Sequence, residues 1–206
     1  MAVVAMQAPQ ATRRPGMNVP RQVLDSFDTL VAMEDKKRTD AGMVILQHVD
    51  HQLREHGQGK EMPVGVKYIV QRLVSGLAST RLRAREGYFS TLCFLLRLHP
   101  AAFTPAFVLA LLTKQKSAAM KAVNKDNYSD PPIPPDLLRL SLQEARDLLV
   151  AEMLLCGAVV RSGVAGQDPA VLQWVVNKLC AMRDKKSYMD ITATQFLVNL
   201  MESCFN

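Results

Sequence analysis

Apolar residues recur every three or four positions along most of the chain, which is the period of amphipathic helices. Pro20 suits the first turn of a helix whose apolar face holds Val23, Leu24, Phe27, Leu30 and Val31. The charged segment 34–40 predicts a joint, after which a second helix carries the stripe Ala41, Ile45, Val49 and Leu53. We expect these two helices to form a hairpin.

The following segment predicts two more helices that meet at a corner. Apolar positions from Val66 to Leu77 define a third helix, and Pro100 ends a fourth. The expected corner comprises Gly76, Ser79 and Thr80, and the expected inward side of the fourth helix comprises Leu82, Arg85, Tyr88, Phe89, Leu92, Leu95, Leu96 and His99.

The second half of the chain predicts four helices and a long loop. Thr104 is expected to cap the fifth helix, whereas segment 117–136 loses the helical period, gathers prolines and predicts an exposed loop. A capping-box pattern, Ser141 with Glu144, would open a sixth helix that runs to Val160. Asp168 would cap a seventh helix, and residues 191–204 form an eighth.

The predicted fold is therefore all-α, with about eight helices in stacked antiparallel pairs. Hairpins start near Pro20, Val64, Thr104 and Ser141, close to the spacing of about 40 to 47 residues in HEAT and armadillo repeats. We expect a disordered tail over residues 1–18 and a helical repeat domain over 19–206. Because the eighth helix stays apolar to its end, the chain is expected to be the N-terminal part of a longer solenoid.

Composition narrows the class of protein only slightly. The net charge of +6 favours polyanionic partners without requiring them. The cysteines are far apart and lack a C-x-x-C pair, so we expect free buried thiols in a cytosolic or nuclear protein; they are Cys93, Cys156, Cys180 and Cys204. The most apolar window, 148–160, is too short to span a bilayer and contains Glu152, so no membrane segment is expected.

Basic residues of the third and fourth helices are the candidates for nucleic-acid contact: Lys67, Arg72, Arg81, Arg83 and Arg97. The sequence favours solvated or helix-bracing charges at these positions over polyanion contact, and a surface for protein partners is the third interpretation. At 100° per residue Arg81 and Arg85 share a face, whereas Arg83 points away and is expected to be the freer candidate for contact. We expect Arg81 and Arg85 to brace the hairpin, with the Arg85 guanidinium seeking carbonyls or carboxylates of a neighbouring helix.

No recognised catalytic or metal-binding motif occurs in the sequence. The only ligand-like cluster is formed by His48 and His51, three positions apart, with His56 near the helix end. No third ligand lies on the face that His48 and His51 share. Neither a P-loop, a nucleophile elbow nor a metalloprotease helix is found. We therefore expect no catalytic residues, no metal, no cofactor, no small-molecule substrate and no enzymatic activity.

Residues 66–96 resemble the N-terminal signature of the DNA polymerase V (phi) and Myb-binding protein 1A family. The matching positions are Lys67, Tyr68, Arg72, Leu73, Val74, Gly76, Leu77, Ser79, Arg81, Ala84, Arg85, Gly87 and Tyr88. The resemblance extends more loosely from Val19 to Cys204, with Arg38 standing for the family's arginine in the earlier helical pair.

The resemblance implies a nuclear and nucleolar protein built as a HEAT/armadillo-like array. It also implies a role in ribosomal RNA gene transcription, ribosome biogenesis and transcription coregulation, through protein partners in the nucleus. Direct contact with DNA or RNA through the basic residues is the alternative. Polymerase activity is not expected, because polymerases of the B family need a carboxylate pair for metal ions in a palm sheet, and this sequence predicts neither. The run Lys36–Arg38 is a weak nuclear-import signal.

Overall fold

Helices are the only regular elements among residues 19–56, 61–113, 135–185 and 187–205, the part of the chain that this computed structural model describes. The all-α prediction is therefore confirmed. The elements are α1 (Arg21–Thr29), α2 (Asp35–His56), α3 (Val64–Gly76), α4 (Leu82–Leu98), α6 (Pro135–Arg161), the 3-10 helix η1 (Val164–Gln167), α7 (Pro169–Lys185) and α8 (Ser187–Phe205). Residues 105–113 are also helical.

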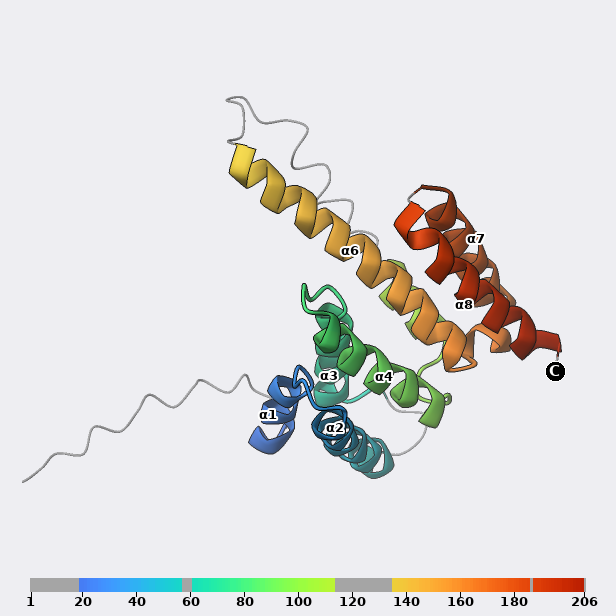
Figure 1. The fold of residues 1–206 in the computed structure, drawn as a ribbon. Helices are drawn as coiled ribbons and strands as arrows, with labels where there is room; N and C mark the ends of the chain where they lie inside the picture. Colours follow the sequence, from blue (N-terminus) through green and yellow to red (C-terminus); the bar gives the residue numbers. More distant parts are fainter. Residues whose placement is uncertain (1–18, 57–60, 114–134, 186, 206) are drawn as a thin grey trace, which may run out of the picture.

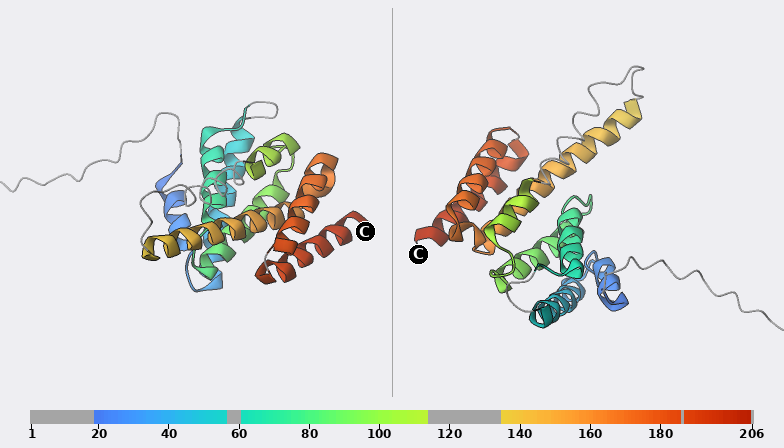
Figure 2. Two further views of the ribbon diagram at one scale, coloured as in Figure 1. Left: turned by 90° about the horizontal axis from the view of Figure 1, so that it is seen from above. Right: turned by 180° about the vertical axis from the view of Figure 1, so that it is seen from behind.

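The long helix α6 lies between two groups of helices (Figures 1 and 2). On one side, α1 packs on α2 and α3 packs on α4, and α6 contacts α4 and α3. On the other side, α7 and α8 form a pair, and α6 contacts both of them and η1. Consecutive helices therefore pack as pairs, and α6 joins the pairs.

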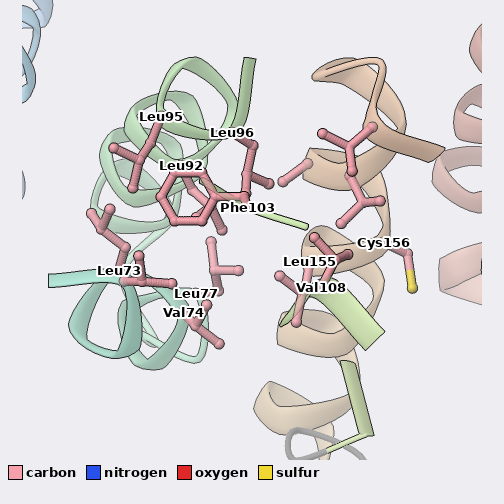
Figure 3. Close-up of a cluster of buried hydrophobic side chains, with 14 of the residues drawn as sticks. Leu73, Val74, Leu77, Leu92, Leu95, Leu96, Phe103, Val108, Leu155 and Cys156 are labelled. Carbon is pink, nitrogen blue, oxygen red and sulfur yellow. The ribbon is translucent and has the colours of Figure 1, made fainter. Parts of the chain in front are cut away.

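The apolar core is continuous between α3, α4 and α6 (Figure 3). Leu73 of α3, Leu77 at the C-cap of α3 and Leu92 of α4 are fully buried, and Leu155 of α6 is 1% exposed. Each such leucine contributes about 2 kcal/mol by leaving water, so the core depends on the helical stripes that the sequence predicted.

Two predicted N-terminal caps are confirmed. The Asp168 carboxylate accepts hydrogen bonds from the backbone N–H groups of Ala170 and Val171, at 2.9 and 3.0 Å. The Thr104 hydroxyl accepts a longer bond, 3.4 Å, from the N–H of Phe107. These side chains satisfy N–H groups that have no partner within the first turn of a helix.

Two predicted helix starts were wrong. The charged joint 34–40 is mostly helical, because α2 begins at Asp35, whose carboxylate suits a helix N-terminus. Likewise, α6 begins at Pro135, so Ser141 lies inside the helix and cannot cap it. Proline is favoured at a first helical position, where its missing N–H would have no helical partner. The predicted tail 1–18 and residues 117–134 of the predicted loop lie outside the described residues.

Other expectations concern single side chains and membrane spans. Leu82, expected to face inward, is 67% exposed because it is the first residue of α4.

Cys156 is buried, Cys93 and Cys180 are half-buried, and all three are free thiols, as expected. Burial raises the pKa of Cys93 to about 12. Within the described ranges, no helix is long and apolar enough to cross a membrane.

Candidate interaction surface

Tyr88 holds the corner between α3 and α4 together. Its ring lies against Gly76, where an added Cβ would come within 2.4 Å of the ring. The ring also stacks on Phe27 of α1, with centroids 6.4 Å apart, and its hydroxyl donates to the Phe27 carbonyl at 3.4 Å. A glycine is therefore required at position 76 because the aromatic side chain occupies the space that a side chain would need.

Arg72 links α3 to α1. Its guanidinium lies 4.4 Å from the centroid of the Phe27 ring, within the range of a cation–π contact. Nη1 donates to the Tyr68 hydroxyl at 3.3 Å, and Nη2 lies 3.6 Å from a carboxylate oxygen of Asp28. Arg72 therefore has three partners within the folded chain, and its side chain is only one-third exposed.

Arg85 links the corner to α6. Its Nε donates to the Ser79 carbonyl and its Nη2 to the Asp147 carboxylate, both at 2.5 Å. We expected carbonyls or carboxylates of a neighbouring helix as partners of this guanidinium; the carboxylate comes from α6, whereas the carbonyl comes from the corner itself. The Asp147 side chain is 7% exposed and also accepts from Gln143 Nε2 at 3.1 Å. Arg85 thus neutralises a buried charge.

Arg38 forms a further junction that the sequence did not predict. Its guanidinium donates to the carbonyls of Ala32 and Met33, at 2.7 and 2.9 Å, and to the Asp35 carboxylate. It also reaches Glu86 of α4 at 3.4 Å. Because this side chain is 9% exposed, the folded chain cannot present all three cations of segment 36–38 as an import signal.

The five candidate nucleic-acid residues do not form one surface. Arg72 is held at α1, and Lys67 pairs with Glu61 at 2.5 Å. Arg81 and Arg97 stand at opposite ends of α4, about 24 Å apart for a rise of 1.5 Å per residue. The remaining candidate, Arg83, pairs with Glu86 of its own helix at 2.9 Å. Contact of any of the five with nucleic acid stays a prediction.

The expected roles of Arg81 and Arg83 are exchanged. Arg83 was expected to be freer than Arg81, but its guanidinium donates to Glu86. Arg81 occupies the N-cap position of α4, where its backbone N–H donates to the Ser79 hydroxyl at 3.2 Å. Its exposed side chain forms no bond with any described residue. Arg81 is therefore the freer cation of the two. The (i, i+3) spacing that places Glu86 beside Arg83 was visible in the sequence and was the missed signal.

A pocket of about 240 Å³ opens between α4 and the end of α6. It is lined by Phe89, Ser90, Cys93, Phe94, Arg97 and Arg161. Arg161 comes from the last turn of α6, and its guanidinium lies 5.7 Å from the Phe89 ring centroid. This pocket was not predicted from the sequence, although Phe94 is an apolar residue outside the buried stripe of α4 and could have indicated it.

The histidines form no metal-ligand set with one another. His51 Nδ1 lies 3.1 Å from a carboxylate oxygen of Glu55. His48 Nε2 is buried and has no hydrogen-bond partner among the described residues. No cluster of three or more His, Cys, Asp or Glu side chains suited to a metal ion occurs in the described part of the chain.

The signature residues that form these junctions lie in the part of the sequence that matches a known protein family, apart from Lys67. A family model described as DNA polymerase phi matches residues 68–205, more than half of the chain. The chain belongs to the DNA polymerase phi family. The resemblance of the sequence to this family is thereby confirmed, and the match begins at Tyr68 within the signature. No curated protein and no solved structure matches the chain significantly.

Membership in the DNA polymerase phi family indicates a nuclear protein with a role in DNA-related or ribosome-related processes. Within the matched range, Tyr68, Arg72, Gly76, Arg85 and Tyr88 contact α1, α6 or one another. The most recognisable residues of this DNA polymerase phi chain therefore hold helices together.

Proposed function

We propose that this chain is a nucleolar helical-repeat scaffold that acts by binding other nuclear proteins. Its role would be that of a transcription coregulator in ribosomal RNA gene transcription and ribosome biogenesis. One observation supports a scaffold above all: the signature residues within the family match are used in packing helices. Arg85 bonds Asp147, and Tyr88 packs on Gly76 and Phe27. Such a signature maintains a shape, and the exposed faces are left for partners.

The proposed architecture is a HEAT/armadillo-like stack. The packing of α1 on α2, α3 on α4 and α7 on α8 supports it, because each pair is consecutive in the sequence. Repeats of this kind bury one face of each pair against the next pair and offer extended surfaces to partners. We propose action by binding, without a cofactor, a small-molecule substrate or polymerase chemistry.

Direct binding of DNA or RNA is the second candidate function. The observation that favours it is the exposed side chain of Arg81, which has no partner among the described residues, on a chain with a net charge of +6. Phosphate contacts release counterions, so such binding would weaken steeply as salt rises.

A salt series separates the two candidates. Fluorescence anisotropy of the purified chain would be measured with duplex DNA and structured RNA, beside an Arg81→Glu/Arg83→Glu variant. A matched control is Arg21→Glu/Arg54→Glu, which makes the same change of charge at two exposed arginines of α1 and α2. Salt-steep binding that only the first variant loses would make nucleic acid the primary partner.

The scaffold proposal itself is tested in cells. We expect the chain, fused to a proximity-labelling enzyme, to label nucleolar proteins, and its depletion to lower the synthesis of ribosomal RNA precursor. Nuclear labelling without any nucleolar protein, together with unchanged precursor synthesis, would contradict the proposal.

A further inference from the structure

The pocket between α4 and α6 combines an exposed aromatic ring with two arginines. Phe94 is 56% exposed, although it lies in the middle of a well-packed helix. Leu98, one turn further along α4, is 58% exposed. An exposed apolar surface beside a pocket is typical of a site that a partner covers.

The floor of the pocket is apolar. The Ser90 hydroxyl turns back to its own helix, with its oxygen 2.9 Å from the Glu86 carbonyl and 3.2 Å from the Gly87 carbonyl. The Cys93 thiol is protonated at neutral pH, because burial raises its pKa to about 12. A volume of about 240 Å³ accommodates one bulky apolar side chain of a ligand.

Neither cation of the pocket has a carboxylate partner among the described residues. Arg97 forms no hydrogen bond, ion pair or ring contact within the described part of the chain. Arg161 lies 5.7 and 5.9 Å from the ring centroids of Phe89 and Phe196, and no acidic residue among those described pairs with it. None of the six lining residues is acidic. Guanidinium groups at such a site favour carboxylates, to which they can form paired hydrogen bonds.

The arrangement fits a peptide better than a nucleic-acid strand. Binding of a single strand requires a row of cations along the backbone and free aromatic faces for the bases. Here the Phe89 ring already contacts Phe196, at 6.1 Å between centroids, and Arg161. Of the two rings that line the pocket, Phe94 alone is largely exposed, and the two cations flank one pocket.

We propose that this pocket binds a short acidic segment of a partner protein. One bulky apolar side chain of that segment enters beside Phe94, and flanking carboxylates bond Arg97 and Arg161. The inference rests on the proposed scaffold function, because it assigns one surface of the scaffold and the chemistry of the partner that it takes.

The test begins with a displayed library of random short peptides, selected on the folded chain. Selected sequences are then made as fluorescein-labelled peptides and measured by anisotropy. We expect an apolar residue flanked by aspartate or glutamate in the selected peptides. Replacing their carboxylates by amides, or the apolar residue by serine, should weaken binding about tenfold. An oligouridylate of similar length serves as the nucleic-acid probe.

Substitutions in α4 test whether the selected peptides bind at the pocket. Phe94→Ala and Arg97→Glu should each weaken binding of the selected peptides about tenfold, and both side chains are exposed enough for the helix to fold. The matched controls are Leu82→Ala, at the start of the same helix, and Arg21→Glu, at an exposed arginine of α1, and both should leave the affinity unchanged. Circular dichroism would verify that all four variants fold.

Three results would overturn the proposal. They are selected peptides without carboxylates, equal binding by Phe94→Ala and wild type, and tight binding of the oligouridylate that only the pocket variants lose. Proximity labelling by the Arg97→Glu chain separates this inference from the scaffold function. If the wild-type chain labels nucleolar proteins and the variant labels the same set, the pocket proposal fails while the scaffold stands. If the wild type labels none, both fail.

Discussion

Arg85 of α4 and Asp147 of α6 form an ion pair between residues 62 positions apart in the chain, with 2.5 Å between Nη2 and Oδ1. Both side chains are largely withdrawn from water, at 18% and 7% exposure. A carboxylate in such a place requires a cation, because an unpaired buried charge is far more costly than an exposed one. The pair therefore fixes where α6 lies on the α3–α4 corner.

Arg85→Ala should lower the free energy of unfolding by about 3 kcal/mol, because the Asp147 carboxylate would lose its cation. Urea denaturation followed by circular dichroism measures the loss. Arg83→Ala is the control, since its pair with Glu86 is exposed and should contribute less than about 1 kcal/mol. Equal stability of Arg85→Ala and wild type would contradict the bracing role.

Lys178→Met should be destabilising by a similar amount, about 3 kcal/mol. The Glu152 carboxylate is 2% exposed and lies 2.6 Å from Lys178 Nζ, so the single substitution leaves a buried charge unpaired. The double variant Glu152→Leu/Lys178→Met removes both charges and should recover most of the loss. A double variant no more stable than Lys178→Met would show that the ion pair is not the cause.

Gly87→Ala should lower the free energy of unfolding by about 2 kcal/mol, although alanine normally favours a helix by about 1 kcal/mol over glycine. A Cβ at this position would lie 2.3 Å from the Leu30 carbonyl oxygen, and backbone cannot move aside as a side chain can. Gly65→Ala is the control, because its added Cβ meets only the end of the Gln52 side chain. Thermal unfolding of both variants distinguishes a close backbone approach from helix propensity.

Stability should fall as the pH drops from about 7 to 5. Burial, and secondarily the neighbouring His51, lowers the pKa of His48 below its usual value of about 6.5. Burial also lowers the pKa of His99; Asp50 opposes the shift and Arg54 adds to it. Because the unfolded chain takes up protons at pH values where the folded chain does not, the free energy of unfolding decreases through this window.

The measurement for these histidines is the melting temperature across the same pH range. His48→Gln/His99→Gln should flatten the dependence, because neither glutamine titrates. An unchanged slope in the double variant would show that other groups cause the loss of stability.

The sequence predicted the helices but not all of their contacts. Periodicity is a local property of the sequence, so the apolar stripes that contain Leu73 in α3 and Leu92 in α4 identified the core faces correctly. The same reasoning suggested carbonyls or carboxylates of a neighbouring helix for Arg85 but could not select Asp147, which follows 62 positions later. Arg38 was placed in a charged joint because only the charges of its neighbours are visible in the sequence, whereas the carbonyls that surround it come from the turn before α2.

The site was harder to predict than the fold for the same reason. Arg97 was grouped with the other basic residues by charge, and nothing in the sequence places it beside Arg161, on another helix. Phe94 and Leu98 departed from the local pattern, because both are apolar and lie outside the buried stripe of α4. A pocket formed by two helices distant in sequence becomes visible only when both are placed.

The position of α6 has a consequence for how the chain can be divided. Leu155 of this helix completes the core formed by α3 and α4, while other residues of α6 contact α7 and α8. A cut between residues 113 and 135 would therefore strip the first group of its apolar cover and leave it prone to aggregation. The two groups should melt in a single cooperative transition, and a protease that nicks the chain between them should release no stable half.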